Sequence, residues 1–449
     1  MAEFVRGIVS RMSAARMLLL ILFVGIVIRL AIASLSITYD SDYWTIVIRN
    51  IESGFGIYEL EGYYYTPAWG YILGLIGAFQ TVFMDMGEVA VRVVEAIFVE
   101  GIGMYVTATI PSLWILFTIK LPLYVCDTIT AFLIRGLVRD QTGDGRKADL
   151  AFALVFLSPV LLESSGVIAM PDTIAVMFTV LTIVLLKKDC PFLAGMTFAI
   201  AVLIKFFPVF LFFVFIAYIL SKNKGDRRRA VSHVAQAAIG ALITVGIMFL
   251  PPFLEGNLAQ CFQFLTDRTG FAGGDLLFDT IAGILRILTY GLVVIGCAYC
   301  AYDMYRDSSE DHFGKLMKAC LIIATLALVY PPTTQYIVIL VPFLAYYIVT
   351  SDRRMMKSWT ILGVGAVIYS SATNGLMFMP LAVWAGVGDV GFLLDLYSFW
   401  NAPFLGPISI EDIQFVIGGV LQCAGILLIL WMLYGDRLLE YRASRAVRG

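Results

Sequence analysis

Histidine and cysteine, the usual residues of metal centres and of many nucleophilic sites, are scarce in this chain. The 449 residues include two histidines, His233 and His312, and both stand beside basic segments, so neither a histidine-based metal site nor a Ser-His triad is expected. The seven cysteines are odd in number and scattered, which argues against a disulfide framework. Cys297 and Cys300 form a CxxC pair inside an apolar run, where helix packing is the better interpretation. The sequence also lacks a P-loop, which excludes a Walker-type nucleotide site.

Charge is scarce as well, at 14% of residues, whereas hydrophobic residues make up 60% and the mean hydropathy is +0.88. A soluble core of this size does not require so much apolar sequence. Repeated apolar runs of about 15 to 25 residues match the length that crosses roughly 30 Å of hydrocarbon. The sequence therefore predicts a polytopic membrane protein, with crossings near residues 17–37, 112–137, 149–163, 172–187, 192–204, 207–220, 234–251, 279–301, 318–331, 335–350, 358–379 and 412–433.

The 31 lysines and arginines are distributed unevenly between the predicted loops. If the crossings alternate, most of these residues fall on one side, in segments 6–16, 135–147, 187–188, 222–229, 306–318, 353–357 and 437–448. The positive-inside rule identifies that side as cytoplasmic. We therefore expect both termini in the cytoplasm and a multi-pass protein of the cell membrane, if its source is prokaryotic. The basic start and first apolar run imitate a signal peptide, but a run of about twenty residues favours an uncleaved anchor.

Two neighbouring segments leave the number of crossings open. Residues 65–84 are apolar enough to cross, whereas residues 86–111 carry charges at near-helical spacing. Either both cross or both lie along the outer surface. We favour the outer surface, because the second segment is typical of an amphipathic interfacial helix. The predicted fold is thus an all-α transmembrane bundle of about twelve crossings (roughly 11 to 14), with juxtamembrane helices in the first outer loop.

Some ionisable residues do not follow this charge distribution. Such groups are costly within a membrane bundle, so they usually face a cavity or a partner. The exceptional cations are Arg29, Arg49, Arg92, Lys120, Lys205, Arg268 and Arg286, and the outer-side acids are Asp40, Asp42, Glu52, Asp172, Asp267, Asp275 and Asp279. Together they predict a polar site at the outer face of the bundle. A transport path would instead favour charges at the bilayer middle and internal repeats, and the sequence has no convincing repeat.

The segment ITYDSDYWTIVIRN, residues 37–50, places Asp40 and Asp42 where the first crossing ends. A positioned carboxylate can act as a general base or as a metal ligand, and nearby cations can hold a phosphate. The tyrosines that follow and Trp69 offer flat faces for a sugar ring, although an interfacial aromatic belt has the same composition. For the two carboxylates, the alternative interpretation is a solvated loop start.

The segment YDSDYWTIVIRNIESGFGIYELEGYYYTP resembles the first outer loop of GT-C glycosyltransferases, most closely that of the mannosyltransferase family that adds the first mannose in GPI-anchor synthesis. Its matching motifs are Asp40-Ser41-Asp42-Tyr43, Gly54 to Tyr58, and Tyr63-Tyr64-Tyr65-Thr66-Pro67. Further similarities follow in the same order, in KLPLYVCDTITAFLIR (Lys120, Pro122, Asp127), SPVLLESSGVIAMPDT (Ser158 in place of the family's Asn), FLAGMTFAIAVLIKFFPVF (Gly195, Lys205, Pro208) and YPPTTQYIVILVPFL (Thr334, Gln335, Tyr336, Pro342). Each motif is loose alone, and the resemblance covers residues 37–345.

This resemblance implies an inverting transfer of one sugar from a polyprenyl- or dolichyl-phosphate donor on the non-cytoplasmic face. It also implies that Asp42, which precedes two aromatic residues, is the general base, and that Asp40 orients it, binds acceptor hydroxyls or ligates a metal. The expected contacts of the donor phosphate are Lys205, Arg268 and Lys120, and the expected substrate-binding residues are Tyr43, Tyr64, Tyr65, Asp172, Gln335 and Tyr336. The alternative interpretations are that Lys205 only snorkels to the membrane surface and that Asp172 or Gln335 only caps a helix.

Several points stay open at this level. No cofactor is expected to be obligatory, because lysine and arginine can meet a single phosphate, but Asp40 and Asp42 would also suit Mg²⁺ or Mn²⁺. The expected partners are the lipid-linked sugar donor, a lipid-linked or glycan acceptor and the bilayer, and not nucleic acid. Mannose is the favoured sugar; glucose or arabinose, or a lipid-linked sugar transporter, are the alternatives. The predicted catalytic module is residues 1–350 with the first outer loop 38–111, followed by C-terminal helices 351–449 with an outer loop at 380–411.

Overall fold

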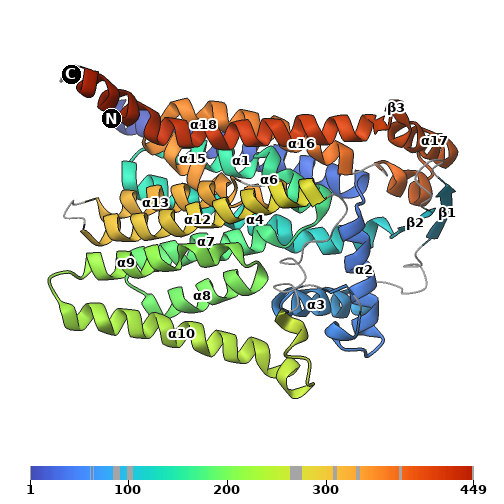
Figure 1. The fold of residues 1–449 in the computed structure, drawn as a ribbon, viewed down its shortest axis with the longest axis horizontal. Helices are drawn as coiled ribbons and strands as arrows, with labels where there is room; N and C mark the ends of the chain where they lie inside the picture. Colours follow the sequence, from blue (N-terminus) through green and yellow to red (C-terminus); the bar gives the residue numbers. More distant parts are fainter. Residues whose placement is uncertain are drawn as a thin grey trace.

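The structure is a computed structural model, and it describes residues 2–60, 62–63, 65–83, 92–98, 105–262, 276–306, 311–329, 334–373 and 377–446. These residues form a bundle of helices that run lengthwise across the molecule (Figure 1). In the N-terminal half, the α-helices are α1 (Ala2–Leu35), α2 (Tyr39–Glu52), α3 (Pro67–Phe83), α4 (Leu113–Thr142), α5 (Gly145–Phe156), α6 (Pro159–Leu162), α7 (Asp172–Lys187), α8 (Pro191–Ile204), α9 (Phe212–Lys222) and α10 (Arg227–Leu254). In the C-terminal half they are α12 (Leu276–Arg306), α13 (His312–Ala327), α14 (Thr334–Ile337), α15 (Leu340–Thr350), α16 (Met356–Thr373), α17 (Val390–Asn401) and α18 (Ile410–Ala446).

Shorter turns of other helix types join these helices. Two are π-helical, η2 (Glu163–Ile168) and η6 (Leu381–Ala385). The others are 3₁₀ turns, η1 (Ile57–Glu59), η3 (Phe207–Leu211), η4 (Gln260–Phe262) and η5 (Arg353–Met355). The strands β3 (Pro403–Leu405) and β4 (Ile408–Ser409) form a small antiparallel ladder between α17 and α18.

Each apolar segment that the sequence predicts as a crossing overlaps one or more helices over most of its described residues. Within the described ranges, six stretches are long and apolar enough to span a membrane, namely Arg16–Leu35, Leu113–Thr142, Gly145–Ile168, Arg227–Leu254, Ile287–Arg306 and Ile410–Tyr434. Large apolar side chains on these helices, such as Phe23, Leu242 and Val420, are exposed. An apolar exterior of this kind is expected where lipid rather than water is the solvent. The chain is therefore a multi-pass integral membrane protein.

One element of the first outer loop is not what the sequence predicts. The expected amphipathic helix at 86–111 is wrong, because β1 (Arg92–Phe98) and β2 (Tyr105–Ile110) pair as antiparallel strands, with Arg92 opposite Ile110. The strand sequences RVVEAIF and YVTATI are rich in β-branched side chains, which lose χ1 freedom in a helix and pack well on a pleated strand. Their preference outweighs the helical spacing of the charges. The predicted segment at 65–84 contains α3, and the loop also has a helix that was not predicted, α2.

The two ends of the bundle differ in what they carry. The start of α1 and the end of α18 lie together at one end, together with the turn between α9 and α10 (Figure 1). We call this the terminal end. The opposite end carries α2, α3, β1, β2 and α17, and we call it the α2 end (Figure 1). An even number of passes through the bundle is consistent with both termini at one end.

The described part of the bundle has two large apolar cores and a smaller one of Ile37, Ile110, Leu116 and Met379. The larger core joins α4, α5, α7, α9, α13 and α15, with buried side chains such as Phe152, Phe215 and Phe343. The second core lies at the α2 end, where Trp44 of α2 and Trp69 of α3 pack edge to face with ring centroids 5.6 Å apart. Both tryptophan side chains are almost completely buried. This second core supports the polar residues of the α2 end.

Candidate functional site

The α2 helix begins at a capping box that fixes the position of its two carboxylates. The Ser41 amide donates to the Thr38 hydroxyl, and the Thr38 amide donates to the Ser41 hydroxyl at 2.9 Å. Asp40 and Asp42 occupy the first turn, where the N-terminal end of the helix dipole favours negative charge. The sequence thus places the Asp-x-Asp pair on a rigid helix start and not on a loop.

The corner between α1 and α2 is anchored to the segment after α6. Ser36, Thr38 and Trp44 each donate a side-chain hydrogen bond to a backbone carbonyl of residues 166–169, at 3.0, 3.2 and 3.0 Å. These carbonyls are accessible because the segment is a π-helix that ends at Ala169 in the left-handed conformation (φ 61°). The carboxylates of α2 are therefore held at a fixed place relative to α7, which begins three residues later.

Lys120 supports the same corner from α4. Its side chain is fully buried, and its ammonium donates to the carbonyl and the hydroxyl of Ser36 at 2.8 and 2.9 Å. A contact with a donor phosphate would require the ammonium to leave these acceptors. The structure gives Lys120 a bracing position, and its assignment as a phosphate contact stays a prediction.

Lys205 is the centre of a polar cluster built from four separate segments. It follows the last residue of α8 in an extended conformation, and its Nζ lies 3.1 Å from Oδ2 of Asp172 at the start of α7. The ring centroids of Tyr65, before α3, and Tyr336, on α14, each lie 5.0 Å from the same ammonium. Both charged side chains are at least nine-tenths buried. An ion pair flanked by two aromatic faces keeps the ammonium charged and in one position.

Asp40 and Asp42 point to different surroundings. Burial raises the pKa of the Tyr65 phenol, Lys205 lowers it, and Asp172 and Asp40 raise it further, so Asp40 is within electrostatic range of the cluster. Burial alone raises the pKa of Asp42 to about 6, and its Oδ1 has no hydrogen-bond partner in the described structure. Residues two apart on a helix are rotated by about 200°. Asp40 and Asp42 therefore leave α2 in different directions, and Asp40 is the one within electrostatic range of the Lys205 cluster.

This divergence also bears on a shared metal ion. Two carboxylates on opposite sides of one helical turn do not fit as joint ligands of Mg²⁺ or Mn²⁺, which needs its oxygen ligands about 2.0 to 2.2 Å from the ion. Among the residues that the structure describes, no group of three His, Cys, Asp or Glu side chains is placed to hold a metal. We derive no chemical step through a metal.

The tyrosines of the first outer loop divide into two groups. The Tyr58 hydroxyl donates to the carbonyl of Tyr65 at 3.0 Å, and the Tyr63 hydroxyl donates to the carbonyl of Thr66 at 3.2 Å. The Thr66 hydroxyl donates to the carbonyl of Leu203, which ties the loop to the end of α8. Tyr58 and Tyr63 thus brace the loop, and Tyr65 is the ring that this loop presents to Lys205.

The other predicted site residues are placed as follows. Tyr43 packs edge to face on Trp44, with ring centroids 5.7 Å apart. Gln335 is half-buried beside Tyr336 on α14. Tyr64 and Arg268 lie outside the described residues. The structure therefore brings together Lys205, Asp172, Tyr65, Tyr336 and Asp40.

Sequence reasoning missed Glu163, the first residue of η2. Its side chain is 2% exposed, neither carboxyl oxygen has a hydrogen-bond partner among the described residues, and it lies within electrostatic range of Asp172. An available signal was the acidic residue in the apolar run PVLLESSGV of a predicted crossing, because an ionisable group inside a membrane segment indicates function by default.

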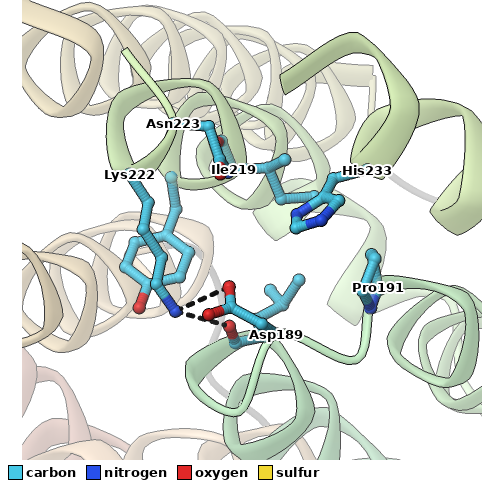
Figure 2. A pocket seen from close by; sticks show the side chains of 8 residues that line it. Asp189, Pro191, Ile219, Lys222, Asn223 and His233 are labelled. Atoms are coloured by element: carbon cyan, nitrogen blue, oxygen red, sulfur yellow. Dashed lines mark hydrogen bonds and ion pairs between the residues drawn. The ribbon is translucent and has the colours of Figure 1, made fainter. Parts of the chain in front are cut away.

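Two other polar places lie at the terminal end. Figure 2 shows the first, where Lys222 pairs with Asp189 at 2.8 Å beside His233. The enclosed volume is about 10 Å³, which suits one water molecule and no sugar. The second is a cavity of about 590 Å³, where Lys315 pairs with Asp303 at 3.0 Å. Neither place combines carboxylates with stacked aromatic rings around a buried cation, as the α2 end does.

No protein-family model matches this chain, and no curated protein matches it either. The functional assignment therefore rests on the residues and their geometry.

Proposed function

We propose that this protein is an inverting membrane glycosyltransferase of the GT-C type. It moves one sugar, with mannose as the favoured one, from a polyprenyl- or dolichyl-phosphate carrier to a lipid-linked or glycan acceptor. The α2 end is then the non-cytoplasmic face, both termini are cytoplasmic, and about twelve segments cross the membrane, with α2, α3 and the β1–β2 hairpin lying outside. The resemblance of the first outer loop to GT-C enzymes and the charge distribution of the loops support this proposal.

The observation that carries the proposal is the buried cation at the α2 end. Lys205 is paired with Asp172 at 3.1 Å and lies between two tyrosine rings, beside a helix start that bears two carboxylates. The donor lipid carries a single phosphate at the membrane surface, and that phosphate becomes an anionic leaving group. A preorganised cation in a site of low dielectric stabilises the developing charge.

The two carboxylates have separate roles in this mechanism. The acceptor hydroxyl attacks the anomeric carbon of the donor sugar, its proton passes to Asp42, and the electron pair of the breaking carbon–oxygen bond leaves with the lipid phosphate. Inversion requires the base and the leaving group on opposite sides of the sugar. Burial alone raises the pKa of Asp42 to about 6, which suits a general base near neutral pH. Asp40, which faces the cluster, positions the substrate.

A transporter for lipid-linked sugars is the second candidate function. The cavity of about 590 Å³ at the terminal end favours it, since a transporter needs polar space at both ends of the bundle. Between the two ends, however, Arg29 of α1 is buried in an ion pair with Asp127 of α4 at 3.0 Å. The two side chains are at most 3% exposed, so these charges pair with each other and do not line a solvent-accessible path, which favours the enzyme.

The decisive experiment replaces Asp42 by Asn in the purified protein. We expect donor binding to be retained and transfer to fall by about 10²- to 10⁴-fold, the usual contribution of a positioned base. The matched control is Glu52→Gln, which neutralises another carboxylate of α2 and should leave transfer unchanged. Asp42→Asn protein that keeps more than about a tenth of wild-type turnover with saturating donor would refute Asp42 as the base. If wild-type protein binds the lipid-linked sugar but moves it across vesicle membranes without transfer, the transporter is correct.

A further inference from the structure

Glu163 presents two hydrogen-bond acceptors that no described residue of the protein uses. Both carboxyl oxygens are buried and have no hydrogen-bond partner, although the side chain is only 2% exposed. Burying a carboxyl group without donors is costly, and most buried polar groups in proteins are paired. Because Glu163 has no hydrogen bond within the described protein that would offset this cost, we expect its carboxyl group to form a hydrogen bond with a ligand.

The backbone around Glu163 is also distorted. Glu163 opens the π-helix η2, and the residue that follows η2, Ala169, has a φ of 61°. Single π-helical turns occur frequently at functional sites, and an alanine in the left-handed region is held there only by its surroundings. At the α2 end, those surroundings include the hydrogen bond from Trp44 to the Ala169 carbonyl. The distortion thus sits between the start of α2 and Glu163.

The position of Glu163 is next to the cluster around Lys205. Its carboxyl is within electrostatic range of Asp172, which pairs with the Lys205 ammonium. The short helix α14, which carries Tyr336 against that same ammonium, packs on η2. Glu163 therefore approaches the cluster from the α6 side, whereas Asp40 approaches it from α2.

The balance of charge around the cluster indicates which part of the donor Glu163 meets. Glu163 and Asp172 supply two carboxyl groups, against the single cation of Lys205. An ionised phosphate offers no donor to carboxyl oxygens, whereas sugar hydroxyls donate hydrogen bonds that carboxyl oxygens accept. We propose that Glu163 binds hydroxyl groups of the donor sugar and so selects which sugar is transferred. This inference rests on the proposed glycosyltransferase function.

The test compares two lipids on three proteins. Polyprenyl phosphate and the same lipid carrying mannose are bound to the detergent-purified wild type, to Glu163→Met and to Glu163→Gln. Methionine keeps the length of the side chain without its oxygens, and glutamine keeps one acceptor. The matched control is Ser358→Ala, which removes another fully buried and unpartnered oxygen from a different part of the bundle.

We expect Glu163→Met to weaken binding of the mannose lipid by about 2- to 10-fold, as for loss of a hydrogen bond between uncharged groups. Binding of the bare polyprenyl phosphate should not change, and the thermal midpoint should stay equal or rise, because no internal bond is lost. Glu163→Gln should fall between wild type and Glu163→Met, and Ser358→Ala should bind both lipids like wild type.

Two results would overturn the proposal while leaving the glycosyltransferase function intact. One is equal weakening of both lipids by Glu163→Met, which would indicate a structural or general electrostatic effect. The other is unchanged binding of the mannose lipid in both Glu163 variants. A wild-type protein that binds neither lipid gives a different pattern, since it refutes the proposed function itself and with it the role of Glu163.

Discussion

The pair of Lys205 and Asp172 allows a binding role to be separated from a structural one. Replacing Lys205 by Met keeps the aliphatic stem but leaves the carboxylate of Asp172, which is 0% exposed, without its cation. Removing one partner of a buried ion pair costs about 3–5 kcal/mol. The contacts of the ammonium with the rings of Tyr65 and Tyr336 add to this loss. Lys205→Met alone should therefore lower the thermal midpoint markedly.

The double variant Lys205→Met/Asp172→Asn removes both charges and should regain most of that stability. Its affinity for polyprenyl phosphate should nevertheless remain low. A hydrogen bond to a charged group contributes about 1.5–3 kcal/mol, so the dissociation constant should increase by roughly 10- to 150-fold. The single variant Asp172→Asn keeps the ammonium, and it should bind the bare lipid phosphate at least as tightly as wild type does.

Thermal unfolding in detergent measures the stability of the four proteins, and equilibrium binding of radiolabelled polyprenyl phosphate measures the affinity. The bare lipid is used because a contribution of Asp172 to sugar binding then does not enter. If the double variant regains wild-type affinity together with stability, Lys205 serves only to neutralise Asp172. The assignment of Lys205 as the phosphate contact would then be refuted.

Three further predictions concern α2. Because burial raises the pKa of Asp42 to about 6, kcat/KM should fall about tenfold per pH unit below that value, and a wild-type profile that is flat between pH 5 and pH 7 would contradict this. The residual activity of Asp42→Asn should show no such decrease at low pH. At pH 7 this variant should also be more stable than wild type, because burial disfavours the charged carboxylate. Asp40→Asn should lose less transfer than Asp42→Asn, whereas equal losses that depend on added Mn²⁺ or Mg²⁺ would indicate a bridging metal. A cysteine at exposed Ser53, after α2, should react with a membrane-impermeant reagent in intact cells, and reaction only after lysis would reverse the proposed orientation.

The helices could be predicted because membrane segments carry their signal in local composition. Each needs a long apolar run, and each such run lies on a helix of the structure. The β1–β2 hairpin could not be predicted in the same way. Its charges follow a helical spacing, whereas its β-branched residues favour strands. A membrane helix can be recognised by the length of its apolar run, but this short segment lies outside the apolar runs, so its length does not decide between helix and strand.

The site could be predicted only residue by residue. The carboxylates of α2, Lys205 and Asp172 stand out as charges beside apolar runs, so their residue types could be identified. Their pairing could not, because Lys205 ends α8 and Asp172 begins α7, and these ends meet only through the antiparallel packing of the two helices. The bracing position of Lys120 depends on Ser36 in another helix, and no local pattern indicates it.

The spacing of the carboxylates in α2 acquires its meaning from the helix that carries them. In an extended strand, residues two apart point to the same side and can share one ion or one proton. At a capped helix start they point apart, so one carboxylate reaches the Lys205 cluster while the other stays in a separate, partly buried place. An inverting displacement needs a base that reaches the sugar from the side opposite the departing phosphate, and it therefore needs one carboxylate that is not engaged with the cluster that holds the phosphate. The capping box of Thr38 and Ser41 is therefore as much a part of the proposed mechanism as the two carboxylates that it positions.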